Sequence, residues 1–203
     1  MSKFNENNGV LIQGHIKIHD PESGAVFVNK RNAIHYENMS IALAESVANQ
    51  GQGFINSMAF GNGGTSVDPT GIITYLTPNS TGTNASLYNQ TYTKVVDDRS
   101  VTNLDPQRNK IETRHVNGTN YTDVLVTCLL DYGEPNGQDA VDQASQANSL
   151  YVFDELGLVS YSPSGTGKLL THVVFHPVQK SLNRLVQIDY TVRVQSLTGF
   201  NEG

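Results

Sequence analysis

Apolar and polar residues alternate with a period of two over several short stretches, which is the pattern of half-buried β-strands. Residues 15–18 (His-Ile-Lys-Ile) and 25–28 (Ala-Val-Phe-Val) show it clearly, and residues 20–24 (Asp-Pro-Glu-Ser-Gly) lie between them. Proline presets the first turn position and glycine supplies the left-handed residue that closes the turn. The segment therefore predicts a β-hairpin.

A second hairpin is predicted around Asn117-Gly118, between strand-like residues 110–116 and 121–132. Both residues of an Asn-Gly pair accept positive φ, so this pair between alternating runs is a strong local hairpin signal.

The C-terminal strand, predicted at 185–194, has one apolar and one polar face. The apolar positions are Val186, Ile188, Tyr190, Val192 and Val194, and the polar positions are Gln187, Asp189, Thr191 and Arg193. One side of this strand should face the core, and the other should face water or a partner.

Further strands are predicted at 91–96, 150–153 with 157–161, and 168–175. One short helix is predicted at about 33–49, with Asn32 or Asn38 as N-cap and Gly51 at its end. Strands do not alternate with helices, which excludes a parallel α/β fold. The predicted fold is mainly β, a sandwich or jelly-roll of about eight or nine strands with one short helix.

Residues 1–203 are expected to form a single β domain with a long extended arm or loop at about 61–90. That segment is rich in Gly, Asn and Thr, and a connection of this length is either functional or a plain surface loop. As an arm, it would order against a neighbouring subunit and add hydrogen bonds to that subunit's sheet edge. Residues 138–147 predict a short polar helix or a loop.

The chain carries 13 Lys and Arg against 19 Asp and Glu, a net charge of −6. Phosphate backbones require clustered basic residues, so direct binding to nucleic acid is not expected. No apolar stretch approaches the length of a membrane span, and the first residues are polar without an apolar export region. A protein made soluble in the cytoplasm, without a membrane partner, is expected.

Candidate chemistry is sparse, and neither an enzyme nor a cofactor is predicted. Cys128 lies in an apolar run and is expected to be a buried core thiol. Residues 162–169 contain Gly-Thr-Gly-Lys but lack the first Gly and the Ser or Thr of a phosphate-binding loop, which favours a hairpin turn. The pairs His15/His19 and His172/His176 lie in strand-like sequence, where four residues span about 13 Å, too far for one metal ion. A metal shared between subunits remains an open alternative.

Residues 24–35 (Gly-Ala-Val-Phe-Val-Asn-Lys-Arg-Asn-Ala-Ile-His), a short Ala-rich helix, and residues 55–65 (Ile-Asn-Ser-Met-Ala-Phe-Gly-Asn-Gly-Gly-Thr) form a recognisable order of motifs. This order, covering about residues 14–65, resembles tailed-phage structural proteins, and residues 130–135 and 176–184 look like segments of myophage virion proteins. The resemblance implies a virion component of the head, neck, collar, tail or baseplate. It supplies no catalytic residues.

The resulting hypothesis is a structural subunit that forms a ring or lattice at the neck, collar or tail, with copies of itself and other virion proteins as partners. The alternatives are a capsid decoration or baseplate/fibre-attachment protein, a carbohydrate- or receptor-binding jelly-roll module, and a hydrolase on a β scaffold. The predicted interface residues are Phe60, Asn62, Thr65, Tyr75, Asn79, Tyr88, Gln187, Asp189 and Arg193.

Overall fold

The computed structural model describes residues 9–136 and 150–197, which form eleven strands and one helix. The elements are β1 (Gly9–His19), β2 (Val26–Ile34), α1 (Tyr36–Val47), β3 (Ile55–Gly61), β4 (Thr65–Val67), β5 (Ile73–Tyr75), β6 (Gln90–Val95), β7 (Lys110–His115), β8 (Tyr121–Leu130), β9 (Leu150–Ser160), β10 (Thr171–Ser181) and β11 (Val186–Leu197).

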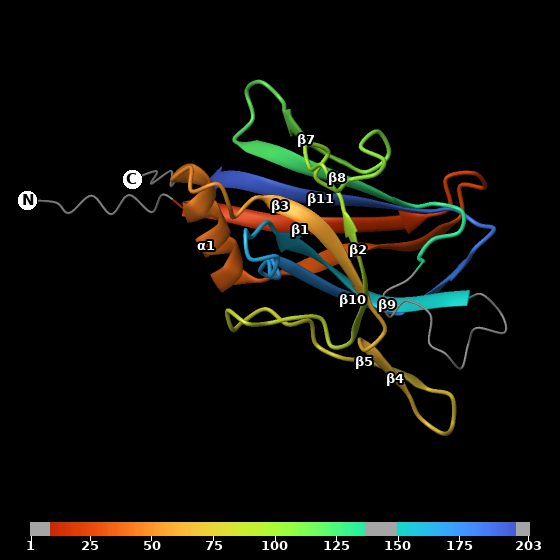
Figure 1. The fold of residues 1–203 in the computed structure, drawn as a ribbon. Coiled ribbons are helices and arrows are strands. Elements are labelled where there is room, and N and C mark those ends of the chain that lie inside the picture. Colours follow the sequence, from red (N-terminus) through yellow and green to blue (C-terminus); the bar gives the residue numbers. More distant parts are fainter. Residues whose placement is uncertain (1–8, 137–149, 198–203) are drawn as a thin grey trace, which may run out of the picture.

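Nine strands form one curled antiparallel sheet in the order β6-β3-β9-β10-β2-β1-β11-β8-β7 (Figure 1). The join between β10 and β2 is short, since only Thr171 and His172 pair there, with Ile34 and Ala33. Four strands lie on one side of this join and five on the other, and their apolar faces enclose the main core. The prediction of a mainly β, sandwich or jelly-roll-like fold with one helix is confirmed.

The apolar and polar residues of β11 lie on the two faces that the sequence predicts for them. Along β1 and β11, pairing runs without a shift from Gly9↔Leu197 to His19↔Gln187. Ile188 and Tyr190 are buried in the core, while Gln187 and Asp189, which alternate with them, are partly exposed. The period of two in the sequence therefore corresponds to one apolar and one solvated face.

Both predicted hairpins are present. Gly24 has φ +75° and closes the β1–β2 turn, in which Asp20 accepts hydrogen bonds from the backbone N–H groups of Glu22 (2.9 Å) and Ser23 (3.2 Å). Gly118 has φ +84° in the β7–β8 turn. Glycine adopts these left-handed conformations without the strain of a Cβ.

Helix α1 is shorter than predicted at its start. Residues 32–34 belong to β2, so neither Asn32 nor Asn38 is the N-cap. His35 takes that position, and its Nδ1 accepts a 3.2 Å hydrogen bond from the backbone N–H of Asn38. Gly51 has φ +68° beyond the helix end. The sequence does not indicate a histidine as the N-cap, because Ser, Thr, Asp and Asn are the residues usually found at this position.

Two of the C-terminal strands are longer than predicted. The stretches 150–153 and 157–161 form one strand, β9, and β10 continues through Pro177 to Ser181. Pairing between β9 and β10 shifts between Val174 and Val178. A bulge tolerates proline because the residue there need not donate to the ladder. The predicted helix or loop at 138–147 lies outside the described residues.

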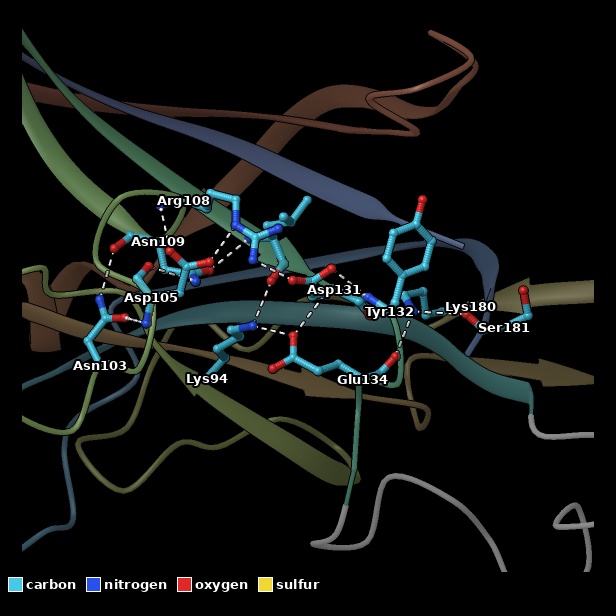
Figure 2. A network of polar contacts seen from close by, with 11 residues as sticks. Lys94, Asn103, Asp105, Arg108, Asn109, Asp131, Tyr132, Glu134, Lys180 and Ser181 are labelled. Carbon is cyan, nitrogen blue, oxygen red and sulfur yellow. Dashed lines mark hydrogen bonds and ion pairs between the residues drawn. The ribbon is translucent and has the colours of Figure 1, made fainter. Parts of the chain in front are cut away.

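A polar network ties the two parts of the sheet together at one side of the core (Figure 2). Lys94 on β6 donates a 2.7 Å hydrogen bond to the carbonyl of Leu129 on β8 and pairs with Glu134. Lys180 on β10 is fully buried, and its Nζ donates to the carbonyls of Asp131 (2.9 Å), Glu134 (2.7 Å) and Ser181 (2.9 Å). Burial lowers the pKa of Lys180 to about 8.

Candidate functional site

A two-stranded ribbon, β4–β5, projects from the body of the molecule (Figure 1). Val67 and Ile72 are each 63% exposed, and Tyr75 and Leu76 are also exposed. The tip is held by Asp68, which accepts hydrogen bonds from the backbone N–H groups of Thr70 (2.8 Å) and Ile72 (3.0 Å). The hydroxyl of Thr70 and these N–H groups lower the pKa of Asp68. The ribbon thus presents apolar side chains to solvent on a fixed backbone.

Glu155 on β9 holds both ends of the segment that carries the ribbon. Its Oε1 accepts hydrogen bonds from the backbone N–H groups of Gly63 (3.1 Å) and Asn89 (2.8 Å), and its Oε2 accepts one from Tyr88 (2.9 Å). His172 on β10 lies 2.9 Å from Oε2 through its Nε2. Neither the Glu155 nor the His172 side chain is exposed.

The hydrogen bonds of His172 define its tautomer. Its Nδ1 lies 2.8 Å from the backbone N of Asn79, which can only donate. Nδ1 is therefore unprotonated, and the ring proton is on Nε2, from which it is donated to Glu155. Burial raises the pKa of Glu155, but the hydrogen bonds from His172 and the three backbone N–H groups outweigh it and hold this pKa below its ordinary value.

Asp154, the neighbour of Glu155, fixes the start of β4. Its Oδ1 accepts a 2.9 Å hydrogen bond from the backbone N–H of Gly64. Its Oδ2 accepts one of 2.9 Å from the N–H of Thr65 and another from the Thr65 hydroxyl. Two buried carboxylates and a buried histidine therefore hold one surface segment. Buried charges require such partners, because desolvation without compensation is costly.

The glycines of residues 61–64 allow this close approach. A Cβ at Gly61 would lie 2.5 Å from Glu155 Oε1, and one at Gly63 would lie 2.7 Å from the backbone N of Asn89. A Cβ at Gly64 would lie 2.9 Å from Val174 Cγ1. The Gly-rich turn is thus required by packing against β9, and the segment at 61–90 rests on the chain's own sheet.

The structure divides the predicted interface residues of this segment into three groups. Phe60 is fully buried and packs edge-on against Phe153, with ring centroids 5.4 Å apart, so it offers no surface. Asn79 and Tyr88 belong to the anchor through their backbone N–H groups. Asn62, Thr65 and Tyr75 lie around the base of the ribbon or on it, with Asn62 and Tyr75 exposed.

The other predicted interface residues lie on the polar face of the five-stranded part. Asp189 accepts a 2.8 Å hydrogen bond from Gln187 and lies 2.8 Å from Nε2 of His19. Arg193 makes two hydrogen bonds to Asp123, of 2.7 and 2.9 Å, and its guanidinium carbon lies 3.8 Å from the Tyr121 ring centroid. This bidentate pairing lowers the pKa of Asp123 and raises that of Arg193.

A shallow hollow of about 550 Å³ lies on this polar face. Arg31 and Arg114 line it together with Arg193 and His15. Within the described residues, neither Arg31 nor Arg114 has a salt bridge. With three arginines and one carboxylate, that of Asp123, in its lining, the hollow is locally positive on a chain whose net charge is −6.

The candidate chemistry of the sequence takes ordinary structural positions. Cys128 is fully buried, and burial raises the pKa of its thiol to about 12. Gly-Thr-Gly-Lys lies in the connection between β9 and β10, as the predicted turn requires. Among residues 9–136 and 150–197, no cluster of His, Cys, Asp and Glu side chains is arranged to hold a metal ion. In the same residues, no helix combines the length and the hydropathy needed to cross a bilayer.

The buried anchor of Asp154 and Glu155 was not anticipated from the sequence. Its signal is two adjacent acids inside an otherwise apolar strand, Val152-Phe-Asp-Glu-Leu-Gly-Leu158. Such acids are buried only when hydrogen-bonding partners meet them. Here the partners come from residues 63–65 and 88–89, which lie far away in the sequence.

Comparisons of the chain with protein-family models, with curated proteins and with solved structures find no match.

Proposed function

We propose that this chain is a structural subunit of a tailed-phage particle that assembles with copies of itself and with other virion proteins. The observation that carries the proposal is the anchored ribbon. Three buried polar side chains, those of Asp154, Glu155 and His172, hold a projecting element that exposes Val67 and Ile72. A rigid apolar projection loses little conformational entropy when a partner covers it, which favours docking.

A second surface supports assembly in rings or lattices. The positive hollow around Arg31 and Arg114 lies on the polar face of the five-stranded part, whereas the ribbon is anchored on β9 and β10. Two unlike surfaces on one subunit allow head-to-tail contacts, and these close into rings when the rotation between neighbours permits. The net charge of −6 makes a positive hollow complementary to an acidic surface of another copy.

The likeness of residues 14–65 to tailed-phage structural proteins supports the particle as the setting. We place the subunit at the neck, collar or tail, with capsid decoration and baseplate or fibre attachment as alternatives that would use the same surfaces. Labelling the chain in purified particles distinguishes these positions, and its absence from the particles would contradict the virion assignment.

The assembly role is tested by multi-angle light scattering over a range of protein concentrations. The wild-type chain should form oligomers, and the double variant Val67→Lys/Ile72→Lys should remain monomeric with an unchanged unfolding midpoint, because both side chains are exposed. Val47→Lys is the matched control, since Val47 is 88% exposed on α1, away from the ribbon. A strictly monomeric wild type, or a ribbon variant that assembles like it, would contradict the proposal.

A further inference from the structure

A polar groove of about 670 Å³ lies on the outer face of the four-stranded part of the sheet. Its floor includes Ser57 of β3, Thr93 of β6 and Val159 of β9, on adjacent strands. Residues 83–86, 100–102, 162 and 165–168 form its walls. The volume lies within the range of about 300–1,000 Å³ that is usual for small-ligand sites.

Most of the lining side chains carry hydroxyl or amide groups, and Ala85, Val101, Val159 and Leu169 add apolar surface. Lys168 is its one charged residue among the described residues, and no carboxylate lines it. Asn56, Ser57 and Asn84 line the groove, and their side chains make no hydrogen bond within the described part of the chain. Uncharged hydrogen-bonding groups beside apolar surface, with a single charged residue, favour a neutral ligand that carries many hydroxyl groups.

An aromatic ring adjoins the hydroxyl-rich lining. Tyr161 lines the groove and is 37% exposed, and Phe54 stacks against it with centroids 4.9 Å apart at an interplanar angle of 7°. Phe54 thereby fixes the orientation of the Tyr161 ring. A fixed tyrosine offers an apolar surface for the C–H face of a sugar ring together with a polar tip.

We infer that this groove binds a neutral oligosaccharide. The inference goes beyond assembly, because the groove is separate from the projecting ribbon and from the positive hollow. An added polypeptide strand fits less well: strand addition uses the unpaired backbone groups of a sheet edge, whereas the floor here is the face of the sheet and presents side chains. An anionic glycan fits the arginine-lined hollow better than a groove with one lysine.

The inference is tested by titrating the isotope-labelled full chain with neutral oligosaccharides and following backbone amides by NMR. The probes are maltohexaose, cellohexaose and chitohexaose, with hexagalacturonate as the charged comparison. At least one neutral probe should shift the amides of residues 83–86 and 165–168. Asn84→Ala combined with Tyr161→Ala should weaken that binding roughly tenfold or more, because a hydrogen bond and a stacking surface are both removed.

Two further variants serve as a blocking substitution and as a control. Ser86→Trp should block the groove without loss of fold, because Ser86 is exposed. Tyr132→Ala is the matched control, since Tyr132 is 52% exposed in the connection after β8 and does not line the groove; its binding should be unchanged. No shift with any neutral probe, equal shifts with hexagalacturonate, or shifts outside the groove would overturn the inference. Concentration-dependent shifts of the groove amides without sugar would also overturn it, by identifying a contact between copies.

Discussion

The Oε2 atom of Glu155 and the Nε2 atom of His172 lie 2.9 Å apart, and neither side chain reaches solvent. Each side chain also accepts a hydrogen bond from a backbone N–H group of the segment at 61–90: Nδ1 of His172 from Asn79, and Oε1 of Glu155 from Asn89. A pair of this kind stabilises a structure only when all its hydrogen bonds are made, because an unpaired buried charge is strongly unfavourable. The Glu155–His172 pair therefore couples strands β9 and β10 to the projecting ribbon.

Removal of the Glu155 carboxylate should destabilise the chain more than removal of a surface carboxylate. Glu155→Ala leaves His172 and three backbone N–H groups without their acceptor, so the free energy of unfolding should fall by about 3–5 kcal/mol. Glu112→Ala is the control, because Glu112 is exposed on β7 and should change that free energy by less than about 0.5 kcal/mol. Urea denaturation at pH 7 measures both, and equal effects would contradict the anchor.

Acid should weaken the same anchor. The pKa of Glu155 is lower in the folded chain than its unfolded value of about 4.3, so its contribution is complete above that value. The contribution is lost as the pH falls through the folded pKa, since the unfolded chain then binds more protons. The difference in unfolding free energy between the wild type and Glu155→Gln should therefore shrink from pH 6 to pH 3. Parallel pH curves for the two proteins would contradict this assignment.

The close approach of residues 61–64 to β9 predicts that a Cβ at Gly63 destabilises the fold, and a glycine with free space around it serves as the control. A Cβ at Gly63 would lie 2.7 Å from the backbone N of Asn89, so Gly63→Ala should lower the unfolding free energy by about 1–3 kcal/mol through overpacking. Gly9→Ala should be neutral or slightly stabilising, because the nearest atom to its Cβ is 3.8 Å away. Thermal unfolding compares the two, and a neutral Gly63→Ala would show that the segment packs less tightly.

Lys180 should act as a buried hydrogen-bond donor. Lys180→Met leaves the carbonyls of Asp131 and Glu134 without this donor and should destabilise the chain by about 2–4 kcal/mol at pH 7. The folded pKa of about 8 lies below the unfolded value near 10.4. Between these values the unfolded chain binds more protons, so the stability of the wild type relative to Lys180→Met should rise with pH.

Guanidinium denaturation at several pH values from 7 to 10 tests both parts of the Lys180 prediction. Lys168→Met is the control, because Lys168 is partly exposed and lines the outer groove. Its effect on stability at pH 7 should be small, because its side chain is not fully buried. A gap between the wild type and Lys180→Met that narrows with rising pH would contradict the prediction.

The sequence predicts the fold class and most strands because local rules govern them. The alternation around Ile188 and the positive-φ glycines Gly24 and Gly118 act over a few residues, and the structure follows them. The start of α1 was misplaced because His35 caps it and residues 32–34 are drawn into β2. Such tertiary competition is not visible in a local pattern.

The candidate site was predicted only in part, for a related reason. The segment at 61–90 stands out by composition, but its anchor depends on Asp154 and Glu155, which reach it across long sequence separations. The burial of Phe60 likewise follows from packing against Phe153 and not from its position before a Gly-rich turn. Contacts with residues far away in the sequence decide which polar residues of a strand are buried, and the period of two in the strand's own sequence does not reveal them.

The pairing of β1 with β11 joins the two ends of the described chain, from Gly9 beside Leu197 to His19 beside Gln187. Both strands lie inside the five-stranded part, with a neighbour on either side, so its sheet cannot be completed until β11 has left the ribosome. Contacts of such long sequence separation slow folding and leave strand edges open meanwhile. During synthesis the β1–β2 hairpin therefore stays without its neighbour on the β1 side, and the order of synthesis delays formation of the polar face until β11 has been made.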